Sequence, residues 1–416
     1  MRQKQILSIL LIAAGLLSAA IGCEPFQDAD KANDIEGLRA EITILSETYK
    51  TDGEGLTLML TDVNKGTMID KPVTGLTMPV DNILPGIYNL SVYGPTKDAE
   101  GRDIYLNGEH INYPIIEDNK KIEVEMKGSL LGPVIFKELF YSGTANFYFR
   151  NQFYEVYNNS EETVYLDGVY FANLYPTNAT TVQPLWREED KGDYAYANRI
   201  WMFPGNGTDY PLAPGESCVI SQFAANHKLP QYNPNSPVDG TSSEFEFNMN
   251  NPNYPDQPAP DMVHVFYDGK AGKGGSPQYL TPVFGGAFVL FKPLEKDKYD
   301  PVNDKSLQAI DQDDYYVQIY AKIPYEYIWD AVEAGDNESK INAKRVPGVL
   351  DMGMTYVGDI YNSQGVSRKK TGERSDGTPL LQDTNNSTYD FDRGVMPQFR
   401  RYGSKIPAWN HTLTEK

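Results

Sequence analysis

The chain has 416 residues, of which 57 are acidic and 37 are basic, and its formal net charge at pH 7 is −20. A protein that binds nucleic acid neutralises phosphates with Lys and Arg, so this charge argues against a nucleic-acid partner. It favours a well-solvated surface that repels copies of itself, and cation capture is the less favoured interpretation. The length suffices for two domains or for one elaborate domain.

Residues 1–22 have the layout of a bacterial secretory signal. A short basic head precedes an apolar run from residue 6 to 20, which is too short for a comfortable membrane-spanning helix. Gly22 and Cys23 follow, and a small residue before a cysteine resembles the lipobox at which a lipoprotein signal is cut and the thiol acylated. Ala20 departs from this pattern, because Leu is more usual there. We predict lipid attachment at Cys23; the alternative is a plain signal with an incidental cysteine.

Residues 23–35 are polar, contain Pro25 and are predicted to be a tether. Its acidic residues Glu24, Asp28 and Asp30 resemble the signal that sends lipoproteins of Bacteroidota to the cell surface. An ordinary solvated linker is the equally weighted alternative. No later segment approaches 18 apolar residues, so we expect no membrane-crossing helix in the mature chain.

Residues 36–130 are predicted to form a first β-sandwich, because apolar and polar residues alternate in four segments. Turn-rich pairs such as Asp52-Gly53 and Pro85-Gly86 separate the segments, which favours antiparallel pairing. The run from Ile83 to Val92 resembles the hairpin of transthyretin-like and carboxypeptidase-regulatory-like immunoglobulin-type modules, which serve as spacers or binding platforms. The alternating apolar positions are Ala40, Ile42, Ile44, Leu56, Leu58, Leu60, Tyr88, Leu90, Val92, Ile122, Val124 and Met126.

Residues 131–416 are predicted to form a second sandwich. A series of segments resembles, in order, the lamin-tail domain, which is an immunoglobulin-like sandwich. In that fold Phe136, Val156 and Leu166 face the core. Glu138 and Glu155 invite an interpretation as a catalytic acid pair, but in this fold they are expected to be strand residues bonded to neighbouring backbone. The segments are residues 134–143, 152–160, 164–171, 212–216, 285–290, 365–368 and 383–391.

The matching segments lie far apart, which predicts two large insertions, at residues 172–211 and 223–284. The second is rich in Pro, Asn and Tyr, and therefore predicts long irregular loops. Four of its aromatic residues are candidates for stacking on a flat ligand such as a sugar ring, although fastening the loop onto the sandwich is the favoured alternative. They are Tyr232, Phe245, Phe247 and Tyr254.

Residues 324–332 are predicted to form one short helix. A proline stands at its first turn, and Tyr325, Ile328, Trp329 and Val332 would share one face. This stripe indicates core packing rather than a binding site.

The sequence predicts no catalytic, cofactor or metal site. The four histidines are scattered and offer no zinc spacing. Asp311, Asp313 and Asp314 begin like a calcium loop, but Tyr316 and Lys322 stand where glycine and glutamate are required. Only a looser calcium site is left as an alternative.

Cys218 is the one cysteine that remains if Cys23 is acylated, so no internal disulfide is expected. It lies in an apolar, β-prone segment, which indicates a buried structural thiol rather than a nucleophile.

The whole arrangement resembles a family of Bacteroidota outer-membrane lipoproteins of unknown function, found beside TonB-dependent transporters. The resemblance implies an all-β protein with two immunoglobulin-like antiparallel sandwiches, anchored by lipid to the outer membrane and exposed at the cell surface. It implies a non-enzymatic accessory role in nutrient or metal-complex uptake, with a transporter and a small-molecule or glycan cargo as partners. The alternative is a structural or adhesive surface protein that binds a glycan or a host protein, and an enzyme is the least favoured hypothesis.

Overall fold

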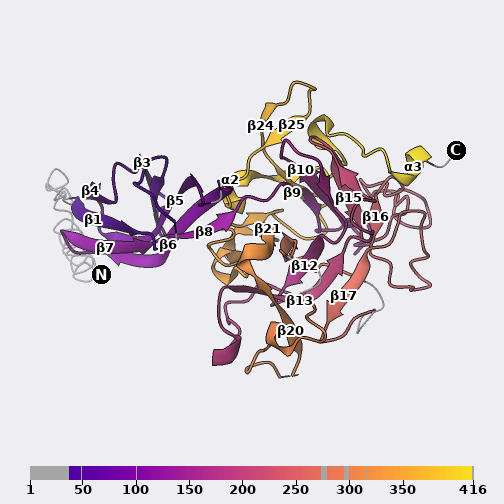
Figure 1. Cartoon of the computed structure of the whole chain (residues 1–416), viewed down its shortest axis with the longest axis horizontal. Helices are drawn as coiled ribbons and strands as arrows, with labels where there is room; N and C mark the ends of the chain where they lie inside the picture. The colour runs from indigo at the N-terminus through magenta and orange to yellow at the C-terminus, as the bar shows by residue number, and fades with distance from the viewer. Residues whose placement is uncertain are drawn as a thin grey trace, which may run out of the picture.

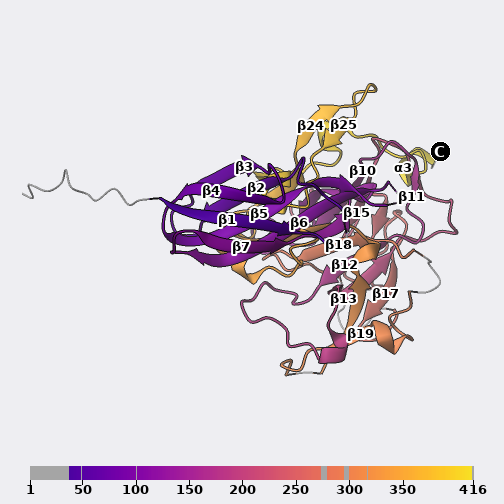
Figure 2. The same ribbon diagram turned by 60° about the vertical axis from the view of Figure 1, so that its left-hand side comes forward.

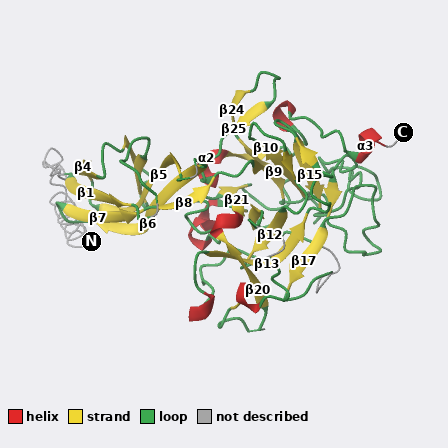
Figure 3. Cartoon of the chain, in the orientation of Figure 1, coloured by secondary structure: helices red, strands yellow, loops and turns green. Residues whose placement is uncertain are grey.

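The computed structural model describes residues 37–47, 49–99, 101–272, 279–294, 299–315 and 317–414. The predicted signal, Cys23 and the tether lie outside these residues. Nearly all regular structure is strand, and helices are single short turns (Figure 3). The first sandwich extends from one side of a larger second sandwich (Figure 1). Among the described helices, none has the length and apolar character needed to cross a membrane.

The first sandwich packs a three-stranded sheet, in the order β4-β1-β7, against a five-stranded sheet, in the order β3-β2-β5-β6-β8. All twelve residues of the predicted alternation are buried in its core, so the period-two prediction is confirmed. The strands are β1 (Leu38–Leu45), β2 (Thr57–Asp62), β3 (Met68–Pro72), β4 (Thr77–Ile83), β5 (Gly86–Lys97), β6 (Asp103–Ile115), β7 (Lys120–Glu125) and β8 (Lys127–Leu130).

Two features of this sandwich differ from the sequence prediction. β1 pairs with β7 in parallel, with Ile42 opposite Ile122, although it pairs with β4 antiparallel. The turn at Pro85-Gly86 joins β4 of one sheet to β5 of the other, so it is a corner between sheets and not a hairpin. The Tyr88 hydroxyl donates to the Leu84 carbonyl at 2.7 Å and closes this corner.

The second sandwich packs a six-stranded sheet, β16-β15-β10-β9-β23-β26, against an eight-stranded sheet, β19-β20-β13-β12-β18-β21-β22 with β17 paired to β13. Its strands are β9 (Val134–Phe140), β10 (Phe153–Asn158), β11 (Val164–Tyr165), β12 (Tyr170–Leu174), β13 (Tyr194–Met202), β14 (Pro211–Leu212), β15 (Ser217–Ser221), β16 (Phe245–Glu246), β17 (Val263–Tyr267), β18 (Ala287–Phe291), β19 (Gln308–Ile310), β20 (Ile319–Pro324), β21 (Ile328–Gly335), β22 (Thr355–Tyr356), β23 (Gly365–Arg368), β24 (Lys370–Glu373), β25 (Pro379–Leu381) and β26 (Phe391–Val395). The short helices are η2 (Glu188–Asp190), η4 (Lys305–Leu307), η5 (Tyr325–Tyr327), η6 (Glu338–Ala343), α2 (Ser387–Asp390), η7 (Arg401–Gly403) and α3 (His411–Thr414).

The core between these two sheets contains Phe136, Val156 and Leu166, as the sequence predicted. A second apolar cluster covers the other face of the eight-stranded sheet, where Ala172 and Phe291 pack. The central strands of this sheet are therefore buried on both faces.

The predicted helix at residues 324–332 is wrong. The chain forms the single turn η5 and then continues as β21. Val332 packs in the core between the sheets, whereas Ala331 packs in the cluster on the other face. A strand that is buried on both faces does not alternate between apolar and polar residues. Its sequence can therefore match the spacing of apolar residues on one face of a helix.

The two predicted insertions differ in structure. Residues 172–211 are not simply loop, because they contain β13, a nine-residue strand in the middle of the eight-stranded sheet. Residues 223–284 contain only the short strands β16 and β17, so the prediction of long irregular loops is confirmed there for the described residues.

Candidate ligand groove between the two sandwiches

The two sandwiches are fixed to one another by contacts between side chains of the first and loops of the second. The Val349 carbonyl accepts from the Ser129 hydroxyl at 2.9 Å and from the Asn107 amide at 3.4 Å. Asn385 donates to the same Ser129 hydroxyl at 2.8 Å. Figure 1 shows β8, which carries Ser129, at the side of the first sandwich that faces the second. Surfaces on both sandwiches are therefore held in one arrangement.

A groove runs along this junction as three adjoining hollows, with volumes of about 790, 520 and 380 Å³. Tyr325 contributes to the wall of all three, so the hollows adjoin at this residue. The two larger hollows are lined by both sandwiches, and the third is lined by the second sandwich alone. We call the three hollows together the interdomain groove. Its defining wall residues are Tyr49, Glu109 and Lys127 of the first sandwich, and Tyr175, Trp186, Asp193, Tyr194, Tyr196 and Tyr325 of the second.

Strand ends place the central tyrosines of the groove. Tyr325 lies in η5, the tight connection from β20 to β21, and its backbone N–H donates to the Asp193 carbonyl at 3.1 Å. Tyr194 begins β13, and its ring covers Gly192 so closely that a Cβ there would come within 2.7 Å of it. Gly192 has φ +154°, which glycine adopts without strain. The local backbone thus presents both rings to the groove.

Further aromatic rings support one end of the groove. The Trp186 and Tyr196 rings are stacked, with centroids 4.1 Å apart and an interplanar angle of 16°. The Tyr175 ring lies 3.9 Å from that of Tyr320. The hydroxyl of Tyr196 donates to the Asp190 carbonyl at 2.7 Å, which fixes its ring. Rigid, half-buried rings of this kind offer flat apolar faces to a ligand at a low cost in conformational entropy.

The polar groups of the groove are tyrosine hydroxyls and charged side chains of both signs. Burial raises the pKa of Tyr325, and it raises the pKa of Tyr196 to about 12, so both phenols keep their protons at neutral pH. Burial also raises the pKa of the Glu109 carboxyl. Lys127 of the first sandwich and Asp193 of the second form an ion pair at 3.7 Å. The arrangement can bind a polar ligand by stacking, hydrogen bonding and ion pairing.

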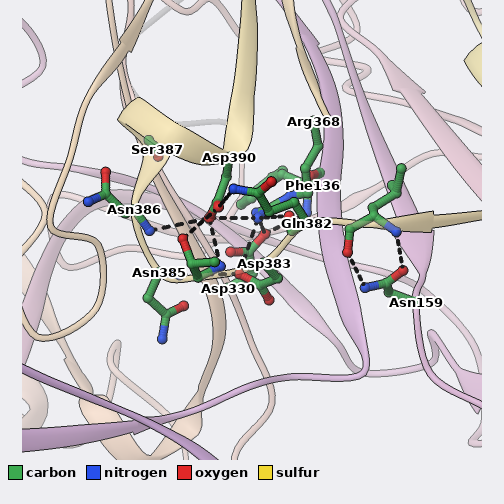
Figure 4. Close-up of polar contacts among 12 residues, drawn as sticks. Phe136, Asn159, Asp330, Arg368, Gln382, Asp383, Asn385, Asn386, Ser387 and Asp390 are labelled. Carbon is green, nitrogen blue, oxygen red and sulfur yellow. Dashed lines mark hydrogen bonds and ion pairs between the residues drawn. The ribbon is translucent and has the colours of Figure 1, made fainter. Parts of the chain in front are cut away.

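A buried ion cluster beneath the junction orients one of the loops that hold the sandwiches together (Figure 4). The Arg368 side chain is 1% exposed and contacts Asp330 at 2.7 Å, Asp383 at 3.1 Å and Asp390 at 3.3 Å. Asp330 also accepts from the Phe136 backbone N–H at 2.6 Å. The cluster therefore ties β9, β21 and the 383–390 loop to one guanidinium.

Three carboxylates around one guanidinium leave excess negative charge in the interior. Burial accordingly raises the pKa of Asp330 and the pKa of Asp390, and Arg368 opposes both shifts. Burial disfavours the charged form of Arg368, but its carboxylate neighbours outweigh this and hold its pKa above the ordinary value. Arg368 thus stays charged throughout the physiological range.

The structure corrects two of the four predicted ligand contacts. Phe245 and Phe247 are 0% and 2% exposed in the core between the sheets, so neither can stack on a ligand and both fasten their loop to the sandwich, as the favoured alternative predicted. The Tyr232 and Tyr254 rings are half-buried and pack edge-on against Phe223 of the same insertion, at 5.6 and 5.5 Å. Ligand contact by these two tyrosines stays a prediction.

Glu138 and Glu155 face each other across β9 and β10, and both are fully buried. Residues 396–410, which we call the C-terminal strap, cover them. Glu138 accepts from the Gln398 backbone N–H at 2.7 Å and from the Arg401 guanidinium at 2.8 Å. Glu155 accepts from Lys137 at 2.7 Å and from the backbone N–H of Arg400. The acids are bonded to backbone, as expected, and also to two cationic side chains, Lys137 and Arg401, which the sequence did not reveal.

Cys218 and Asp311, which the sequence analysis also considered, have structural roles. Cys218 is fully buried on β15, and burial raises the pKa of its thiol well above the ordinary value. Asp311 accepts from the Leu185 backbone N–H at 2.8 Å and from the Tyr175 hydroxyl at 3.1 Å, which ties two loops together.

Among the described residues, Glu246, Asp256 and Asp261 offer oxygen atoms within 4.8 Å of one another, close enough for one cation. The Glu246 oxygens accept from two backbone N–H groups, and the Asn248 amide donates to both aspartates. These donors satisfy the acidic group within the protein, and we assign it no metal.

Sequence reasoning missed the groove residues. Tyr325 was attributed to a helix core, and the aromatic residues before β13 were not singled out. The turn-forming Lys191-Gly192-Asp193 before an aromatic strand was the available signal. The groove itself could not be foreseen, because its two walls come from distant parts of the chain, such as Tyr49 and Tyr325.

Comparisons with known proteins place the chain among proteins of unknown function. A family model described as "Protein of unknown function (DUF4876)" matches residues 213–398. The crystal structure of a DUF4876 family protein from Bacteroides thetaiotaomicron is 50% identical, with 90% of this chain and 100% of that chain covered and a TM-score of 0.67. A cell adhesion protein from Bacteroides eggerthii, at 8% identity over 70% of this chain and 83% of its own, has a TM-score of 0.18 and carries no argument. No curated protein matches the chain.

Proposed function

This chain belongs to the DUF4876 family of unknown function, and we propose that it is a lipid-anchored binding protein of the bacterial outer membrane. In this proposal the interdomain groove holds a small-molecule or glycan cargo for a TonB-dependent transporter. The observation that carries it is the set of half-buried aromatic rings of the second sandwich around Tyr325, next to two hollows that both sandwiches line. Concave sites between domains with rigid rings and a few polar groups are typical of ligand binding.

The non-enzymatic part of the proposal is supported by where the reactive side chains lie. Glu138 and Glu155 are fully buried beneath the C-terminal strap, with their oxygen atoms engaged by backbone N–H groups and cations. The Cys218 thiol is buried as well. A substrate would have to displace packed chain to reach any of them, whereas the groove is open.

The anchor is tested by a Cys23→Ser substitution in the native host. Loss of the thiol removes the acylation site, and we expect the protein to move from the outer-membrane fraction to the soluble fraction. Unchanged membrane fractionation of the variant would contradict lipid attachment at this residue.

The groove is tested by mass spectrometry of small molecules released from protein purified from the native host. We expect a compound that accompanies the wild type and is depleted at least tenfold from a Tyr194→Ala/Tyr325→Ala variant. Tyr232→Ala, a half-buried tyrosine outside the groove, is the matched control and should retain it. Equal recovery from all three proteins, or loss only from the control, would refute the groove as the site.

The role in uptake is tested by affinity purification from detergent-solubilised outer membranes. A co-purifying TonB-dependent transporter supports the accessory role. A host or matrix ligand in its place would favour the structural or adhesive alternative.

A further inference from the structure

One end of the first sandwich, which we call the distal end, lies farthest from the second sandwich (Figures 1 and 2). Strand register defines it: Leu38 of β1 is opposite Ile83 of β4, and Gly86 of β5 is opposite Ile115 of β6. β1 begins here, so the N-terminal segment joins the sandwich at this end.

Exposed apolar side chains concentrate at the distal end. Five large ones are there, and in the rest of the described first sandwich only Ile111, Leu45 and Leu76 are similarly exposed. Leu45 and Leu76 mark the opposite end, where β1 finishes and β4 begins. The five are Ile116 (64% exposed), Met68 (51%), Val63 (43%), Ile87 (40%) and Leu84 (39%).

These side chains belong to different turns, and hydrogen bonds to backbone carbonyls link the turns to one another. The Val63 N–H donates to the Ile87 carbonyl at 2.9 Å, and the Tyr88 hydroxyl donates to the Leu84 carbonyl at 2.7 Å. The apolar group is thus part of a rigid sandwich end rather than of a single loop.

Charges beside this apolar group are balanced locally, in contrast to the strongly acidic chain as a whole. Arg39 pairs with Asp81, Lys120 with Glu117, and Lys121 with Glu41, each at 3.6 Å. Lys65 adds an exposed cation next to Val63. Asp62 and Asp118 also lie at this end, which makes it close to neutral, so an anionic lipid surface repels it only weakly.

We propose that the distal end rests on the lipid bilayer, with Ile116, Ile87 and their neighbours at the boundary of headgroups and acyl chains. The inference rests on the lipid anchor of the proposed function. Residues 24–36 would connect Cys23 to the sandwich, and such a stretch spans at most roughly 45 Å. Because the anchor raises the effective concentration of the distal end at the membrane, even weak affinity is enough to hold it there.

The contact would set the height of the groove. β6 has 13 residues and runs from the distal end to the junction, which is roughly 40 Å at the rise of a β-strand. With the distal end on lipid, the first sandwich is a rigid spacer that presents the interdomain groove to the exterior at a fixed distance from the bilayer.

The proposal is tested with single labelled cysteines in the full acylated protein. Cys23 carries the lipid and Cys218 is buried, so a fluorophore attaches selectively at Ile116→Cys or at the control Leu76→Cys. The proteins are reconstituted in phosphatidylethanolamine/phosphatidylglycerol vesicles with headgroup-nitroxide lipid. We expect lipid quenching at residue 116 to exceed that at residue 76 at least threefold, and iodide quenching to show the reverse order.

Each other outcome overturns the inference. Equal quenching at both positions would show that the sandwich does not lie on lipid. Protection of residue 116 from iodide without lipid quenching would show that protein, such as a second copy, covers the distal end. Co-flotation of the acylated wild type with the vesicles, and its loss in Cys23→Ser, is measured separately, so a failed anchor is distinguished from a failed contact.

A second variant guards against perturbation by the label. Ile87→Asp/Ile116→Asp places charge in the patch, and a fluorophore at Leu84→Cys should then lose its lipid quenching while flotation persists. Leu45→Asp/Leu76→Asp at the opposite end should leave that quenching unchanged. Equal quenching in both double variants would refute the proposal.

Discussion

The two sandwiches bury different chemistry. The core of the first is apolar, and its few buried polar residues carry a single acid, Asp62. The second encloses ionisable side chains throughout, among them Lys137, Glu155, Glu333 and Arg368. Apolar burial is almost independent of pH, whereas buried ions lose stability when a partner is removed or titrated. The first sandwich should therefore respond mainly to lost volume, and the second to lost charge.

The largest expected effect is on the ion cluster of the second sandwich. Arg368→Met leaves Asp330, Asp383 and Asp390 buried without their cation, and should lower the free energy of unfolding by about 3–5 kcal/mol. All four tryptophans of the chain lie in the second sandwich, so their fluorescence during urea unfolding reports on it. Lys405→Met, at an exposed ion pair of the same sandwich with Asp376, is the control; an equal loss in both variants would contradict the importance of the cluster.

In the first sandwich, Leu90→Ala should cost about 2–5 kcal/mol through lost burial and the cavity left behind. The unfolding transition of the first sandwich, followed by far-UV circular dichroism, should move to lower urea concentration. The shift relative to the wild type should be the same at pH 5 and pH 8. A shift that depends strongly on pH would break the distinction between the two cores.

The pH dependence of the second sandwich should be visible at Glu246. Burial raises the pKa of Glu246 to about 7, although hydrogen bonds from the backbone N–H groups of Ala224 and Gln257 favour the charged carboxylate and act to lower the pKa. A carboxyl group with a higher pKa in the folded chain than in the unfolded chain binds its proton more tightly when folded. Its contribution is present at low pH and is lost as pH rises through about 7.

Urea unfolding followed by tryptophan fluorescence should therefore show the second sandwich losing on the order of 2 kcal/mol between pH 5 and pH 8 because of this group. In Glu246→Gln the free energy of unfolding should fall less between pH 5 and pH 8 than in the wild type. An equal fall in both proteins would mean that other buried acids dominate the pH dependence.

The smallest effect is expected at the surface of the first sandwich. Lys97 and Asp103 form an ion pair at 2.5 Å, but their side chains are 63% and 68% exposed. Lys97→Ala should change the free energy of unfolding by less than about 1 kcal/mol, and high salt should remove the difference. A larger loss in the same circular dichroism assay would show that surface charge contributes to this sandwich after all.

The sequence revealed the first sandwich far better than the second. Ile42, Leu58 and Leu90 alternate with solvent-facing residues, so one period identified both the strands and their buried faces. It could not identify the parallel pairing of β1 with β7, because alternation carries no information about strand direction.

In the second sandwich the same signal is weak, because β21 is buried on both faces and its apolar residues show no period of two. The positions of the aromatic residues were also difficult to predict from the sequence. Phe245 was expected in an irregular loop and Tyr325 on the core-facing side of a helix, yet Phe245 fills the core and Tyr325 lines the groove. What separates them is the position of the first sandwich, which no local pattern encodes.

The C-terminal strap makes the packing of one sheet face depend on a distant segment of the sequence. Until residues 398–401 dock, Glu138 and Glu155 have no partners on the strap and the rings of Phe140 and Phe153 have no cover from Phe399. The second sandwich therefore reaches its final packing only when this segment folds onto it. A product truncated before residue 396 would expose this charged and aromatic sheet face, and is expected to aggregate or to be degraded.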